Sequence, residues 1–197
     1  MSRTALLVID VQVGIIDGLR AYRGAEVLNI IAALLSRARE SATPVIYVQH
    51  DGEAGHPLEA GSLGWQIHPS VAPAYAEPVV RKKASDSFFE TTLKQELDQR
   101  GIDHLIVTGC ATQYCVDTAC RRAVSLGYDV TLVSDAHTTV DNEIFTAEQI
   151  IAHHNSLLDG FDALNRCQSG ICSPQICEII QDFGADLVAP FRSTPTR

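Results

Sequence analysis

The residues with the clearest chemistry lie in one short run, Gly109-Cys110-Ala111-Thr112-Gln113-Tyr114-Cys115-Val116. An apolar segment, 104–108, precedes the run, and small or apolar residues follow Cys115 at helical spacing, at 116, 119, 120, 123 and 124. Cys115 is therefore expected near the start of a helix. Free N–H groups and the helix dipole there should lower the thiol pKa and favour the nucleophilic thiolate. A buried structural cysteine is the common alternative, which position alone does not exclude.

Titratable side chains also follow the other apolar segments of the chain. In chain order they are Asp10, His50, Asp51, Lys82, Lys83 and Asp135. A thiolate nucleophile needs a cation to stabilise it and a base to take its proton, and a lysine and an aspartate can fill those roles. The run Asp10-Val11-Gln12-Val13-Gly14 lacks the glycine spacing of a dinucleotide fingerprint. The pattern thus indicates nucleophilic catalysis rather than nucleotide binding.

A scaffold that gathers the ends of several strands would bring these residues together, and the chain has the pattern of one. Apolar segments typical of buried parallel strands alternate with helical patterns. Strands are expected at 5–9, 45–48, 78–81, 104–108, 130–133 and, weakly, 167–172; helices at 27–38, 92–100, 115–126, 146–159 and from Pro174. This order predicts a Rossmann-like three-layer α/β/α fold with a central, mostly parallel six-stranded sheet. Sites in such sheets lie at the carboxyl ends of the strands.

Several local signals refine this prediction. Thr92 with Gln95, and Thr146 with Gln149, have the spacing of capping boxes that start helices. Gly127 is the expected left-handed stop of the helix after Cys115. Residues 51–75 are rich in Gly, Pro, Glu and His and predict a long loop, a type of segment that is often functional.

Length and composition narrow the function classes. The 197 residues predict a single domain over 1–197, and the net charge of −9 argues against nucleic acid and anionic membrane surfaces as partners. No apolar run approaches the roughly 18 residues of a transmembrane helix. The first apolar stretch is short and ends in Asp10, unlike a signal peptide. A cytoplasmic location is therefore expected, with the cysteines mostly reduced.

The six cysteines do not have the spacing of a zinc site. They fall at 110, 115, 120, 167, 172 and 177, and no pair is separated by two residues. Cys110, Cys120 and Cys177 are expected as small buried hydrophobic residues. The roles of Cys167 and Cys172 stay open.

Four segments together resemble the isochorismatase-like cysteine hydrolases, the superfamily of nicotinamidases and N-carbamoylsarcosine amidase. They are Val8-Ile9-Asp10-Val11-Gln12, Val79-Val80-Arg81-Lys82 followed by Ser87-Phe88, Gly109-Cys110-Ala111-Thr112 to Cys115-Val116, and Leu132-Val133-Ser134-Asp135-Ala136. The resemblance covers about residues 5–160 and fades after about 165.

The resemblance implies a role for each matching residue. Asp10 would be the general base and later the acid, Lys82 the cation, and Cys115 the nucleophile. A cis peptide would precede Ala111, so that the backbone N–H groups of Ala111 and Cys115 form an oxyanion hole. Lys83 is the rival to Lys82, which is preferred because the family lysine precedes the phenylalanine by six residues.

The resemblance also bears on metals. Nicotinamidase-like members hold a divalent metal through an Asp-x-His pair and a further histidine, but this chain has Gln49-His50-Asp51 at that position. His56 and His68 could still contribute to a metal site, but surface or loop histidines are the preferred interpretation. No metal and no cofactor are expected. His154, on the apolar face of its helix, is expected as a packed, hydrogen-bonded core histidine.

The implied function is cleavage of a C–N bond in a small amide through a thioester on Cys115. Gln12, His50, Trp65 and Tyr114 are candidate substrate-binding residues, with ordinary packing as the alternative for Trp65. A small-molecule amide is the expected partner, and a homo-oligomer is expected. Two alternatives remain: a catalytically silent binding or scaffolding protein on the same fold, or a hydrolase of another small-molecule bond. Because isochorismatases proper lack the nucleophilic cysteine, enol-ether hydrolysis is disfavoured.

Overall fold

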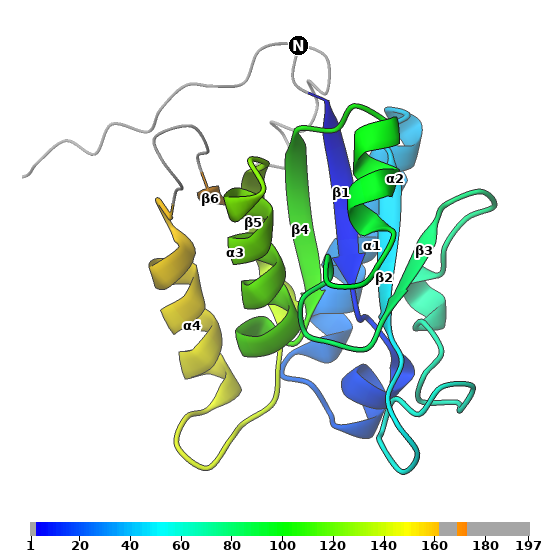
Figure 1. Cartoon of the computed structure of the whole chain (residues 1–197). Coiled ribbons are helices and arrows are strands. Elements are labelled where there is room, and N and C mark those ends of the chain that lie inside the picture. Colours follow the sequence, from blue (N-terminus) through cyan, green and yellow to red (C-terminus); the bar gives the residue numbers. More distant parts are fainter. Residues whose placement is uncertain (1–2, 162–168, 173–197) are drawn as a thin grey trace, which may run out of the picture.

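The structure is a computed structural model that describes residues 3–161 and 169–172. Six parallel strands form one sheet in the order β3-β2-β1-β4-β5-β6 (Figure 1). Their bounds are β1 Thr4–Ile9, β2 Val45–His50, β3 Val79–Lys82, β4 His104–Cys110, β5 Asp129–Thr138 and β6 Ser169–Cys172. The predicted fold class is confirmed. The strand order reverses between β1 and β4, which makes their carboxyl ends the switch point of the sheet.

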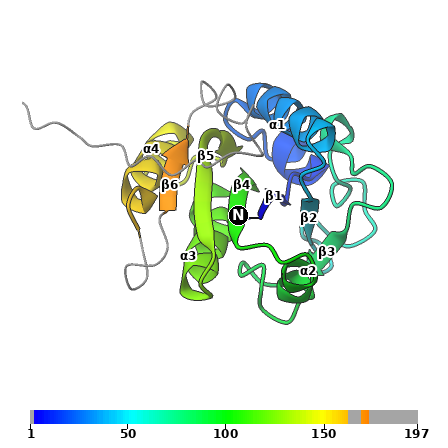
Figure 2. The ribbon, with the colours of Figure 1, turned by 90° about the horizontal axis from the view of Figure 1, so that it is seen from above.

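Helices cover both faces of the sheet, as the view in Figure 2 shows. Helix α1 (Gly24–Glu40) lies on one face, and α2 (Leu93–Gln99), α3 (Asp117–Ser125) and α4 (Ala147–Leu158) lie on the other. Each face buries its own apolar core, because alternate residues of β1 point in opposite directions: Leu6 and Val8 join the α1 core, whereas Leu7 and Ile9 join the core of α2 and α3.

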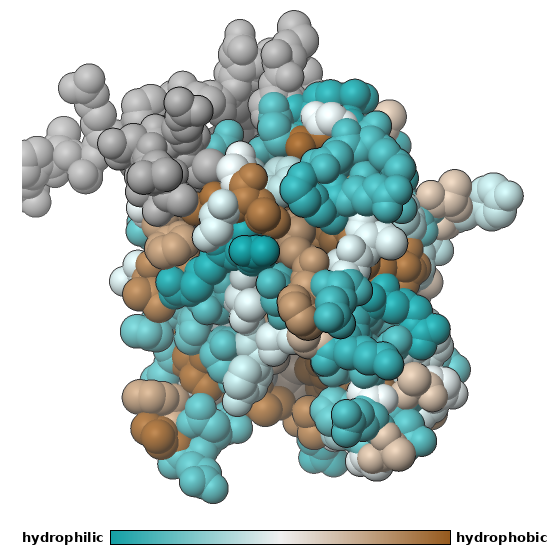
Figure 3. Space-filling model, in the orientation of Figure 1, coloured by the Kyte–Doolittle hydropathy of each residue, from teal (hydrophilic) through white to brown (hydrophobic). Residues whose placement is uncertain are grey.

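Short helical turns occupy several connections. They are η1 (Gly14–Gly18) and η3 (Thr112–Val116), both π-helical, and the 3₁₀ turn η2 (Pro69–Val71). The rest of the segment 51–75 is built mostly of turns, which confirms the predicted loop. The surface in Figure 3 is largely hydrophilic with scattered apolar groups. None of the helices in the described ranges has the length and hydropathy of a membrane span.

Strand β5 is longer than the sequence pattern predicts. It continues to Thr138, so Asp135 lies within the strand and does not follow it. The pairing of β4 with β5 is irregular between Val107 and Gly109, and after it Gly109 and Cys110 pair with His137 and Thr138. The added residues of β5 interrupt the apolar pattern, which is why the sequence predicts an end of the strand at Val133.

The helix signals were partly correct. The capping box of Thr146 and Gln149 starts α4, and Gly127 has a φ of +92° just after α3, both as predicted. The predicted box at Thr92 is wrong, since its side chain caps nothing. The hydroxyl of Thr91 accepts a hydrogen bond from the Leu93 N–H instead. The predicted helix from Pro174 lies outside the described residues, as do Cys167 and Cys177.

Candidate active site

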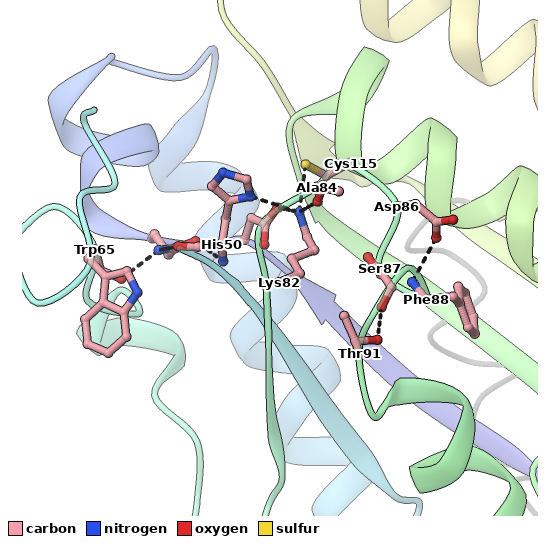
Figure 4. A network of polar contacts seen from close by, with 11 residues as sticks. His50, Trp65, Lys82, Ala84, Asp86, Ser87, Phe88, Thr91 and Cys115 are labelled. Carbon is pink, nitrogen blue, oxygen red and sulfur yellow. Dashed lines mark hydrogen bonds and ion pairs between the residues drawn. The ribbon is translucent and has the colours of Figure 1, made fainter. Parts of the chain in front are cut away.

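Lys82, the last residue of β3, is the centre of the site. Its Nζ lies 2.7 Å from Asp10 Oδ2. It also lies 3.0 Å from Cys115 Sγ and 3.4 Å from His50 Nδ1 (Figure 4). It also donates a hydrogen bond to the Ala84 carbonyl at 3.0 Å, because the chain folds back over Lys82 after β3. The Lys82 side chain is 0% exposed and that of Asp10 is 1% exposed. The Lys82 ammonium, the Asp10 carboxylate and the Cys115 thiol thus meet in the interior of the protein.

Asp10 follows β1 with an unusual backbone conformation. Its φ of +50° is left-handed, a region that aspartate tolerates better than most residues. Its N–H donates to the Val48 carbonyl at 2.9 Å, and its carbonyl accepts from the Gln12 N–H at 2.8 Å. The groups of the described residues that act on its carboxylate are the Lys82 ammonium and the Cys115 thiol. A buried carboxylate in this state has capacity to accept a proton.

Cys115 lies in the π-helical turn η3, immediately before α3, and so near the start of a helix, as predicted. Cys110 and Ala111 precede this turn and are joined by a cis peptide, as predicted. The Ala111 carbonyl accepts hydrogen bonds from the N–H groups of Tyr114 and Val116, which closes the turn on itself. The side chain of Cys115 therefore projects from a compact loop toward Lys82 (Figure 4).

The electrostatics of the site differ from the expectation of a lowered thiol pKa. Burial raises the pKa of Cys115 to about 12, the negative Asp10 raises it too, and Lys82 only partly opposes them. Burial lowers the pKa of Lys82, but Asp10 and Cys115 outweigh it, so the net pKa is raised and the ammonium persists. The sequence pattern indicated a helix start and a cation but not the burial or the nearby carboxylate. The raised pKa favours the protonated form of the resting thiol.

A cavity of about 850 Å³ lies beside the Lys82 cluster. Its lining is rich in charged and polar residues: His50, Asp51, Gly52, Glu53, His56, Ala60, Arg81 and Lys83. Lys83 is exposed and lines this cavity, so of the two rival lysines only Lys82 contacts Cys115. His50 contacts Lys82 and also lines the cavity, which puts it between the buried cluster and the open space.

The side chain of Gln12 makes its contacts inside the protein. It is fully buried, donates to the carbonyls of His50 and Trp65, and accepts from the His50 N–H at 2.9 Å. Gln12 therefore joins β1 to the end of β2 and has no surface that a substrate can reach.

Trp65, the other loop candidate, is also engaged by protein groups. Its indole N–H donates to Asp51 Oδ1 at 2.8 Å, and the Arg81 guanidinium lies 4.8 Å from the ring centroid. Arg81 closes the cluster through an ion pair with Asp51 at 2.8 Å. Trp65 thus packs against the cavity wall, while Tyr114, the neighbour of Cys115 in the chain, is 59% exposed.

The remaining histidines and cysteines have ordinary partners. His56 and His68 accept hydrogen bonds from nearby backbone N–H groups, at Leu58 and Ser70. Within residues 3–161 and 169–172, no group of three His, Cys, Asp or Glu side chains has the arrangement of a metal site. His154 is half-buried, not a core residue, although it bonds the Ile150 carbonyl. Cys110 and Cys120 are buried as predicted.

Sequence reasoning missed one part of the site, the support beneath the nucleophile loop. His137 is buried and lies 2.9 Å from the Thr112 hydroxyl through Nδ1. Its Nε2 lies 2.8 Å from Asn155 Oδ1 on α4. Because the sequence predicts an end of β5 at Val133, it leaves His137 outside the strand. A longer strand places this polar residue in the interior, and that placement is the signal that could have found it.

Comparison with known proteins yields a consistent result. The family model described as an isochorismatase domain matches residues 4–152. A streptothricin hydrolase of Streptomyces noursei is 40% identical over 138 residues, covering 70% of this chain and 50% of that protein. A ureidoacrylate amidohydrolase of Variovorax paradoxus is 36% identical over 83 residues, covering 42% of this chain and 33% of that protein. The chain thus spans about half the length of the streptothricin hydrolases it matches.

Solved structures agree with the sequence matches. A crystal structure described as a putative isochorismatase from Burkholderia xenovorans superposes with a TM-score of 0.80 at 31% sequence identity. The superposition covers 91% of this chain and 86% of that one.

Proposed function

The chain belongs to the superfamily of isochorismatase-like cysteine hydrolases, and on this premise we propose that it hydrolyses the C–N bond of a small amide. Asp10, Lys82 and Cys115 act as its catalytic triad. The observation that carries this proposal is the buried Lys82 Nζ, in contact with both the Asp10 carboxylate and the Cys115 sulfur. A relative named as an amidohydrolase supports the choice of an amide bond.

Because the resting thiol is protonated in this proposal, its attack on the substrate must be coupled to the loss of its proton. Cys115 Sγ attacks the amide carbonyl carbon while its proton passes to Asp10, so that no free thiolate need accumulate. The backbone N–H groups of Ala111 and Cys115 bind the resulting oxyanion. Lys82 remains cationic and holds the Asp10 carboxylate in place.

Collapse of the tetrahedral intermediate breaks the C–N bond. The proton on Asp10 passes to the leaving nitrogen, and a thioester remains on Cys115. Water then attacks the thioester, and Asp10 takes a proton from this water. The carboxylic acid leaves, and the proton returns to the Cys115 sulfur.

The candidate substrate-binding residues have different tasks in this proposal. Lys82 can only donate, so it faces a lone pair on His50 Nδ1, and the neutral ring carries its proton on Nε2. Burial and then Lys82 lower the pKa of His50, which favours this neutral form. His50 can therefore donate to an acceptor atom of the substrate. Gln12 and Trp65 act indirectly, by shaping the wall, and Tyr114 flanks the entrance.

A screen for ammonia release from a panel of small primary amides and N-carbamoyl compounds tests the proposal. We expect turnover by the wild type and a loss of about a thousandfold or more in Cys115→Ser, because a hydroxyl is a far weaker nucleophile. Cys120→Ala, which removes a buried cysteine of α3, is the matched control and should remain active. Intact-mass measurement after acid quenching should detect an acyl adduct on Cys115.

Two outcomes would favour the other candidate functions. No ammonia release and no acyl adduct across the panel would favour a binding protein without catalysis. Hydrolysis of an enol ether that survives in Cys115→Ser would favour isochorismatase-type chemistry.

A further inference from the structure

Three side chains, of which two are buried, link the nucleophile loop to β5 and α4. His137 of β5 lies between Thr112 of η3, at 2.9 Å, and Asn155 of α4, at 2.8 Å. Asn155 Nδ2 in turn donates to the Ser134 carbonyl at 3.0 Å. His137 and Thr112 are each 1% exposed. None of these side chains contacts Lys82 or Cys115 among the described interactions, so the chemistry proposed above leaves them unexplained.

The Ser134 carbonyl, at the end of this series of hydrogen bonds, fixes which group donates and which accepts in each of them. A carbonyl oxygen only accepts, so the Asn155 amide nitrogen faces Ser134 and its oxygen faces His137. His137 must then carry its proton on Nε2 and offer a lone pair at Nδ1. The Thr112 hydroxyl therefore donates to Nδ1. Burial lowers the pKa of His137 to about 4, which keeps the ring neutral and this arrangement intact at neutral pH.

The chain of bonds ends next to the atoms that would bind an oxyanion. Thr112 directly follows Ala111, and Cys110, on the other side, pairs with Thr138 of β5. The loop is thus held by adjacent residues of β5, through a backbone pairing before Ala111 and a side-chain bond after it. The irregular register of β4 and β5 is what brings His137 to this position.

We propose that His137 is a positioning residue of the active site: through Thr112 it orients the Ala111 N–H toward the oxyanion of the substrate. The inference rests on the proposed cysteine-hydrolase function. It assigns to His137, a buried histidine whose hydrogen bonds go to Thr112 and Asn155, an effect on acyl transfer only. Simple attack by the sulfur that forms no oxyanion should not depend on it.

Two chemical probes separate these effects. p-Nitrophenyl acetate acylates the thiol: Cys115 Sγ bonds to the acetyl carbon, the bond to p-nitrophenolate breaks, and the thiol proton passes to Asp10. This reaction forms an oxyanion. Iodoacetamide alkylates the same sulfur by displacement of iodide and forms none. The rate of each reaction at Cys115 is followed by mass spectrometry of the Cys115 peptide, so the natural substrate is not needed.

We expect Thr112→Val and His137→Phe to slow acylation about tenfold or more, because loss of one oxyanion-hole donor costs about a hundredfold and misorientation costs part of that. Alkylation should change by less than about threefold. Thr112→Ser keeps the hydroxyl and should retain most of the acylation rate. The double variant should be little worse than either single one, since both remove the same bond. His153→Phe, which changes an exposed histidine of α4, is the control.

Each contrary result has a definite meaning. Equal slowing of acylation and alkylation in Thr112→Val would show a general structural role and overturn the inference. Unchanged acylation in both single variants would overturn it as well. If the wild-type protein is alkylated but never acylated at Cys115, the proposed function itself fails, and the inference fails with it.

Discussion

At the scale of single residues, the site holds opposite charges beside a neutral thiol. Asp10 and Lys82 form a buried ion pair whose charges cancel. A thiolate at Cys115 would give this buried group a net negative charge. The same carboxylate that raises the pKa of the thiol is the group that, in the proposed mechanism, removes its proton during attack. Asp10 is therefore expected to suppress the reactivity of the resting sulfur while it enables catalysis.

This double role predicts opposite effects of Asp10→Asn on two measurements. Amide turnover should fall by about a thousandfold because no base remains. Alkylation of Cys115 by iodoacetamide at pH 7.5 should become faster, by about tenfold for each unit by which the thiol pKa falls, since Lys82 then pairs with the thiolate alone. The labelling rate at Cys115 is measured by peptide mass spectrometry.

Asp17→Asn is the control for this prediction, because Asp17 is 62% exposed and lies outside the cluster. It should change neither turnover nor labelling. Slower alkylation in Asp10→Asn than in the wild type would contradict the prediction, since it would mean that the carboxylate activates the sulfur in the resting protein.

At the scale of elements, the approach of β4 to β1 determines where Cys115 lies. Gly109 near the end of β4 has a φ of +123°, and a Cβ there would lie 2.0 Å from the Ile9 carbonyl oxygen. Gly109→Ala should therefore cost about 4 kcal/mol or more in the free energy of unfolding, because both the backbone conformation and the space forbid it. Urea denaturation followed by circular dichroism measures this loss.

Gly127→Ala supplies the comparison, since Gly127 also has a positive φ, of +92°, but nothing lies within 4 Å of a Cβ there. Its cost should be about 1 kcal/mol, the conformational penalty alone. Similar costs at the two positions would show that the contact with Ile9 relaxes easily and that β1 and β4 do not need this close approach.

Sequence patterns predicted the elements that have regular periodicity and missed those that tertiary contacts define. The strands and helices around Asp10, Lys82 and Cys115 follow from alternating apolar segments, and the family resemblance selected Lys82 over Lys83. The extension of β5 to Thr138 depends on an irregular pairing with β4, which leaves no periodic signal. The raised pKa of Cys115 depends on burial, which only the folded structure shows.

At the scale of the whole molecule, the six-stranded sheet brings residues from distant parts of the chain to one edge. Asp10, Lys82 and Cys115 come from three different segments, and the switch point between β1 and β4 puts two of those segments side by side. A single domain over residues 1–197, a homo-oligomer and a cytoplasmic location remain predictions.

Buried histidines should make the whole fold sensitive to acid. Burial lowers the pKa of His104, and it lowers that of His137 to about 4, so the unfolded chain binds more protons than the native one between about pH 4 and 6.5. Stability therefore rises with pH in this range and is lost as the pH falls through 6.5. From pH 7.5 to 5.5, His137 alone should remove about 1 kcal/mol from the free energy of unfolding.

Urea denaturation at pH 7.5, 6.5 and 5.5 measures this loss, and variants separate its sources. His137→Phe lowers stability at every pH, but the difference between pH 7.5 and 5.5 should shrink by about 1 kcal/mol, because the residue that must gain a proton on unfolding is gone. His153→Gln changes an exposed histidine of α4 and should leave the pH dependence as in the wild type. A pH dependence that His137→Phe leaves unaltered would mean that His137 is protonated in the native protein. The ring could then no longer accept the hydrogen bond of Thr112, and the support of the nucleophile loop would have to come from other contacts.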